Sequence, residues 1–132
     1  MPSRRHHHTI LLWLGALALG LTGCAGSGGE GAGIDELLAR IDGQLDQAIP
    51  EMTDCFQREL GTRSQTLNGR IAVQFEIGDD GLVGKLNVLE SELGAPEADE
   101  CVAITISRQY FPDWEGRRPV RLTKPFQFVA GQ

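Results

Sequence analysis

Histidine is absent from this sequence after His8, and long apolar runs are absent after Leu21. Without histidine, the rest of the chain lacks the side chain that proteins use most often as a general base and as a metal ligand. A later apolar stretch such as Val102–Ile106 is far shorter than the roughly 20 residues that a membrane-spanning helix needs. These absences argue against a second membrane segment and against histidine-based catalysis.

Basic residues are also scarce. The chain has 12 Lys and Arg residues against 18 Asp and Glu residues, which gives a net charge of −6. Nucleic-acid binding needs a concentrated basic surface, so the composition argues against a nucleic-acid partner.

Residues 1–23 have the pattern of a bacterial signal peptide, with a pair of arginines followed by about a dozen apolar residues. The apolar part closes with the segment Leu21–Cys24, which reads Leu-Thr-Gly-Cys and is typical of a lipobox. We therefore predict that Cys24 becomes the first residue of the mature chain and carries the lipid. The alternative is a simple secretory signal that is cleaved near Gly23 and leaves Cys24 as an ordinary thiol.

Lipidation would anchor the protein to the periplasmic face of a bacterial membrane, because two or more acyl chains bind stably to a bilayer. Ala25 follows the cysteine, where an aspartate would favour retention in the inner membrane, so we expect the outer membrane. Residues 24–33 are rich in glycine and are predicted to form a flexible tether. Residues 34–132 then form one small domain. Without Arg4 and Arg5, ten basic residues stand against the same 18 acidic ones, a net charge of −8.

The chain has three cysteines. If Cys24 carries the lipid, Cys55 and Cys101 remain as an even pair, and exported proteins usually join such thiols in a disulfide. Closing a loop of this length stabilises the fold by roughly 4 kcal/mol in the loop-entropy model. The alternatives are two buried free thiols or half of a metal site, although zinc would then need carboxylates, which make a poor structural ligand set. We predict the disulfide, with no metal and no cofactor.

Hydrophobic periodicity predicts a mixture of helices and three strands, the first two joined by a tight turn. An apolar stripe at helical spacing starts at Ile34, and Pro50 divides it into two helical pieces. This first helix is expected to pack against the core, with a stalk or partner-binding helix as the alternative. The predicted elements are helices at about 34–48 and 51–60, a polar loop at 62–68, strands at 70–77 and 82–89, a helix at 96–109 and a strand at about 118–129.

The last strand is predicted to lie at the edge of the sheet, because Pro125 cannot donate a hydrogen bond to a neighbouring strand. An edge strand offers unpaired backbone groups to a partner. Four cations flank this edge and are candidates for steering an acidic partner: Arg117, Arg118, Arg121 and Lys124. Alternatively, they only keep the edge strand soluble. The candidate binding residues on the strand are Val120, Arg121, Leu122, Thr123, Lys124, Phe126, Gln127 and Phe128.

Several short motifs occur in an order that resembles a known family. They are Cys55-Phe56, the segment 69–77, Asp80-Gly81-Leu82-Val83, the segment 90–93, Cys101-Val102, Phe111-Pro112 and the segment 125–128. Together they cover about residues 50–128. In this order and spacing they resemble the AgmX/PglI C-terminal domain of myxobacterial and related envelope proteins, which is similar to the TonB C-terminal domain. The family usually has tyrosine where this chain has Phe56, and a second proline where it has Trp114.

The resemblance implies an α+β fold, a small TonB C-terminal-like domain with a three-stranded antiparallel sheet packed with two or three helices. It also implies a place in the cell envelope and a role in binding other proteins. We therefore expect a non-enzymatic adaptor with an envelope protein as its partner. No serine has an evident base beside it, and no pair of carboxylates is set apart for glycoside chemistry. The alternative function is a structural lipoprotein that associates with peptidoglycan. The sequence does not indicate an oligomeric state.

The lipid assignment leads to a direct prediction. Globomycin, which inhibits the lipoprotein signal peptidase, or the substitution Cys24→Ala should abolish lipid-dependent fractionation with membranes. An alanine variant that still partitions wholly with membranes would show that the anchor lies elsewhere.

Overall fold

The computed structural model describes residues 29–131, so the predicted signal peptide, Cys24 and the first tether residues lie outside the described part. The fold is α+β, as predicted, with one antiparallel sheet in the order β2-β1-β3. The elements are α1 (Gly29–Gln47), α2 (Ile49–Leu60), a 3-10 helix η1 (Gly61–Thr66), β1 (Gly69–Ile77), β2 (Val83–Ser91), α3 (Pro96–Ser107), a 3-10 helix η2 (Pro112–Trp114) and β3 (Val120–Phe128).

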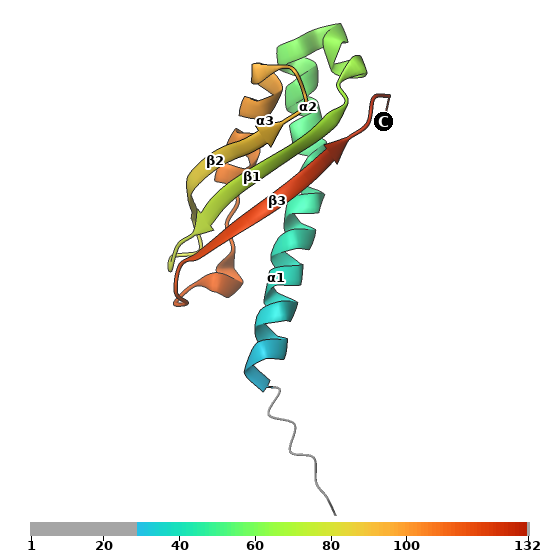
Figure 1. The fold of residues 1–132 in the computed structure, drawn as a ribbon. Coiled ribbons are helices and arrows are strands. Elements are labelled where there is room, and N and C mark those ends of the chain that lie inside the picture. The colour runs from blue at the N-terminus through green and yellow to red at the C-terminus, as the bar shows by residue number, and fades with distance from the viewer. Residues whose placement is uncertain (1–28, 132) are drawn as a thin grey trace, which may run out of the picture.

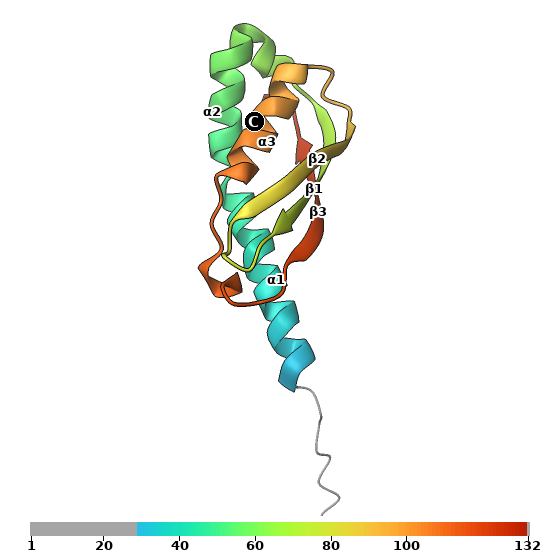
Figure 2. The same cartoon turned by 90° about the vertical axis from the view of Figure 1, so that its left-hand side faces the viewer.

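The helices cover one face of the sheet and leave the other face to solvent (Figures 1 and 2). The core lies between these two layers. Met52 on α2 and Val102 and Ile106 on α3 are fully buried there. Phe56 of α2 meets Phe128 of β3 edge-to-face, with ring centroids 4.9 Å apart, which fixes the end of β3 to the helical layer.

The central strand β1 follows the predicted alternation. Ile71, Val73, Phe75 and Ile77 point into the core and have no exposed surface. Because successive side chains of a strand point to opposite faces, one slip in register would move all four to solvent. The alternation therefore specifies both the strand and its register.

The disulfide joins the two helices of the covering layer. Cys55 lies on α2 and Cys101 on α3, and their Cα atoms are 5.7 Å apart. Cys101 is buried, whereas Cys55 is half-buried. The bond therefore links α2 to α3, although the whole β1–β2 hairpin lies between these helices in the sequence.

The hairpin turn packs against the aromatic corner that precedes β3. Asp80 Oδ1 accepts a hydrogen bond of 3.0 Å from the Leu82 amide, which accounts for this aspartate by turn chemistry. Gly81 has φ +75°, and a Cβ there would lie 2.5 Å from the Phe111 carbonyl oxygen. Glycine is therefore required at this contact by both conformation and space.

Two boundaries differ from the sequence-based prediction. Helix α1 begins at Gly29, so residues 29–33, which we assigned to a flexible tether, are helical. Each glycine in a helix costs about 1 kcal/mol relative to alanine, but extending a helix that packing has already nucleated is much easier than starting one. No proline interrupts this stretch.

Most of the predicted polar loop at 62–68 is helical. Its first part forms the 3-10 helix η1, in which Ser64 Oγ donates a hydrogen bond of 2.7 Å to the Gly61 carbonyl oxygen. Thr66 Oγ1 bonds in the same way to the carbonyl oxygen of Arg63 at 2.9 Å. Local bonds from hydroxyls to the backbone explain why a polar segment without a hydrophobic pattern adopts a helical turn.

The helix-to-helix disulfide gives a stability prediction. The double substitution Cys55→Ala and Cys101→Ala should lower the free energy of unfolding by roughly 4 kcal/mol, because the denatured chain regains the entropy of an open loop. Thermal unfolding monitored by circular dichroism should show a Tm lower by about 15 °C or more. A loss below about 1 kcal/mol would contradict this account of the bond.

Candidate partner-binding edge

The sheet has two outer strands, and only one of them is regular. β3 pairs with β1 without interruption from Gly69 with Phe128 to Ile77 with Val120. β2 shifts register twice against β1, and at one shift Lys85 adopts φ +46°. Bulges of this kind disrupt the ladder and blunt an edge against further pairing. β3 therefore presents the more uniform template for an added strand.

The register shows which backbone groups of β3 are available. The Arg70 carbonyl oxygen accepts a hydrogen bond of 2.8 Å from the Glu92 amide, and the Arg70 amide donates one of 3.1 Å to the Glu92 carboxylate. Both groups of Arg70 thus point toward the β2 side. Its cross-strand partner is Gln127, whose backbone groups must then point away from β1, to the open edge.

Every second residue of β3 shares this orientation. Arg121, Thr123 and Pro125 have the same phase as Gln127, so their backbone groups also face outward. Pro125 lacks an amide hydrogen, and its place at the open edge leaves the ladder with β1 intact. This agrees with the prediction that the proline marks an edge strand.

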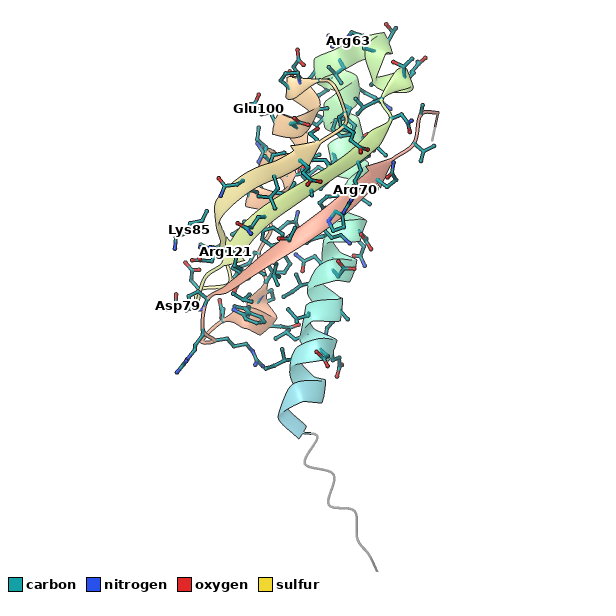
Figure 3. The ribbon with its side chains drawn as sticks, viewed as in Figure 1. Arg63, Arg70, Asp79, Lys85, Glu100 and Arg121 are labelled. Atoms are coloured by element: carbon teal, nitrogen blue, oxygen red, sulfur yellow. A yellow bond between two sulfur atoms is a disulfide. The ribbon has the colours of Figure 1, made fainter. Side chains whose placement is uncertain are left out.

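The side chains of β3 alternate between the two faces. Arg121, Thr123 and Gln127 are exposed, whereas Phe126 and Phe128 are buried and Val120 and Leu122 are half-buried. Arg121 Nη2 lies 3.6 Å from Glu76 Oε2 on β1, and Lys85 Nζ lies 3.0 Å from the other carboxylate oxygen. Figure 3 shows Arg121 and Lys85 close together on the sheet.

Lys124 differs from what the sequence suggested. We grouped it with the cations that would steer an acidic partner, but its side chain faces α1 and is only 13% exposed. Its Nζ lies 2.7 Å from Asp42 Oδ1 and 2.8 Å from Asp46 Oδ1. Period-two alternation places Lys124 on the inner face, where these two acids satisfy its charge. Burial by itself would lower the pKa of Lys124, but the hydrogen bonds and charges of the two carboxylates raise it above the ordinary value.

Two of the other candidate cations, Arg117 and Arg118, lie in the loop before β3. Arg117 Nε donates a hydrogen bond of 3.1 Å to the Asp113 carbonyl oxygen, and its guanidinium lies 6.0 Å from the centre of the Trp114 ring. Arg118 is exposed, and its carbonyl oxygen accepts a bond of 2.9 Å from Trp114 Nε1. These contacts hold the loop that leads into the edge strand.

A shallow groove runs between α1 and β3. It has a volume of about 360 Å³, and its lining combines apolar side chains with the ion pair of Asp42 and Lys124. Leu38 and Leu45 of α1 and Leu122 of β3 form much of its apolar lining. The inner side of the open edge is therefore flanked by a surface of α1 that carries both apolar and acidic side chains.

Neither a metal-ligand cluster nor a membrane-spanning helix occurs in residues 29–131. Among them, no group of three or more His, Cys, Asp or Glu side chains is arranged to hold a metal ion. No helix in this part of the chain is long and apolar enough to cross a bilayer. No protein-family model, curated protein or solved structure matches the chain.

The Lys124 cluster gives a prediction about pH. The substitution Lys124→Gln should lower the free energy of unfolding by about 1 kcal/mol at neutral pH. Because folding raises the pKa of Lys124 above 10.5, this contribution is complete below that value and disappears as the pH rises through the folded-state pKa. Urea unfolding of both proteins at neutral and strongly alkaline pH measures the difference.

Lys85→Gln is the matched control, because Lys85 is 69% exposed and its ion pair should contribute less than about 0.5 kcal/mol. Equal losses in the two variants, or a Lys124 effect that persists at strongly alkaline pH, would contradict the prediction.

Proposed function

We propose that this chain is a non-enzymatic adaptor of the cell envelope that binds an extended segment of a partner protein along β3. In this mode of recognition the peptide adds a strand to an exposed sheet edge, and main-chain hydrogen bonds provide affinity. The observation that carries the proposal is the contrast between the two edges. β3 is regular over its whole length, whereas β2 is interrupted by two shifts.

The proposed location follows from the sequence. A lipid on Cys24 would hold the domain at the periplasmic face of a membrane, with the outer membrane favoured by Ala25. The resemblance to the AgmX/PglI C-terminal domain and to the TonB C-terminal domain supports a protein-binding role in this compartment. A discrete envelope protein is thus the expected partner.

Gln127 offers the sharpest test of the edge. Gln127→Pro removes an amide that points to the open edge and leaves the hydrogen bonds between β1 and β3 in place. In-cell crosslinking followed by mass spectrometry should recover a partner with the wild-type protein, and Gln127→Pro should reduce that recovery about tenfold. Such a loss reflects a missing hydrogen bond and a ring in the path of the added strand.

Gln127→Ala is the matched control, since it shortens the side chain but keeps the amide. It should recover the partner as wild type does. Circular dichroism must show that Gln127→Pro is folded, and unaltered crosslinking by a folded proline variant would refute the edge model. Cosedimentation with purified sacculi, without any protein partner, would instead favour the peptidoglycan-associated function.

A further inference from the structure

Helix α1 extends beside the open edge of β3 in the helical layer. Figure 1 shows α1 passing behind β3 and continuing beyond it. The ion pairs of Lys124 with Asp42 and Asp46 and the groove between the two elements place them in direct contact. A segment paired with β3 would therefore lie over α1, and its inward side chains would meet this helix.

The surface that α1 offers there is acidic. Asp42 and Asp46 lie one helical turn apart, and their side chains remain 58% and 55% exposed although both contact Lys124. Two carboxylates share one ammonium group, so the cluster keeps a net negative charge. Asp35, two turns before Asp42, is exposed on the same side of the helix. A further cation would thus find favourable charge and open space.

An apolar contact lies next to this charge. Leu38 is one turn before Asp42, about 6 Å along the helix axis, and lines the groove together with Leu45 and Leu122. Alternate residues of an extended strand point to the same side and are about 6.6 Å apart. The separation of two inward side chains on one added strand is therefore close to the separation of Leu38 and Asp42 along the helix axis.

We infer that the partner segment carries a lysine or arginine that points inward to Asp42 and Asp46, with an aliphatic residue two positions away that enters the groove at Leu38. This inference rests on the proposed function and specifies its partner. It also reverses the expectation from the sequence, in which cations of this chain would attract acids. The inner side of the edge attracts a basic segment because Lys124 is already neutralised within the fold.

Two end-blocked peptides of about seven residues test the inference. One has the sequence Thr-Val-Thr-Lys-Thr-Val-Thr, and the other replaces its central lysine with glutamate. Fluorescence anisotropy of the labelled peptides measures their affinity for the purified mature protein at low ionic strength, where charge effects are least screened. We expect the lysine peptide to bind about tenfold more tightly, because the glutamate would face two carboxylates.

Two variants should change this preference in opposite directions, and a third should leave it unchanged. Asp42→Asn should reduce it to about twofold, whereas Lys124→Gln should increase it, since it frees both carboxylates for the peptide. Glu36→Gln is the matched control: it removes the same charge from α1 on the side that bonds Arg40 and, through it, Asp113, so the preference should not change.

The outcomes separate this inference from the function on which it rests. If Gln127→Pro weakens both peptides while Asp42→Asn and Lys124→Gln leave their ratio unchanged, the edge function stands and the basic partner is refuted. If neither peptide binds, or if binding is insensitive to Gln127→Pro, the edge function itself is refuted, and this inference with it.

Discussion

Burial of β1 is the constraint on which the rest of the structure depends. This strand is paired on both edges and buries four large apolar side chains against the helices. β2 and β3 can each pair only with β1, so each keeps one open edge within the described chain. Either open edge could in principle accept another strand. The bulges of β2 interrupt its edge, so β3 is the better template.

The elements that the sequence predicted well are those with a strong local period. β1 alternates apolar and polar residues over its length, and Pro96 together with acids in the same first turn marks the start of α3. The cysteine pair was predicted from an even count after one thiol was assigned to lipid, which needs no geometry. In each case the signal is a property of the segment or the count and does not depend on tertiary contacts.

The parts that were not predicted depend on neighbours distant in sequence. The role of Lys124 depends on Asp42 and Asp46, which lie about 80 positions earlier, so no local pattern could show that its charge is neutralised. The early start of α1 also depends on tertiary packing. The glycine-rich composition of residues 29–33 predicts a flexible segment when it is considered alone, but it does not show that the segment continues a helix that is already packed against the core. The choice between the two edges required register shifts, which composition does not reveal.

The early start of α1 has a consequence for the position of the domain. For a chain held at Cys24, only four residues separate the lipid from the helix. Among the residues whose burial the structure describes, which begin at Gly33, the first buried one is Leu37, about 12 Å along the helix axis from Gly29. In such a chain, helical residues 29–36 would contribute to the offset between the lipid and the body of the domain, in place of the coil that the glycine-rich composition predicts. Its partner would be met within a narrow range of heights above the lipid surface.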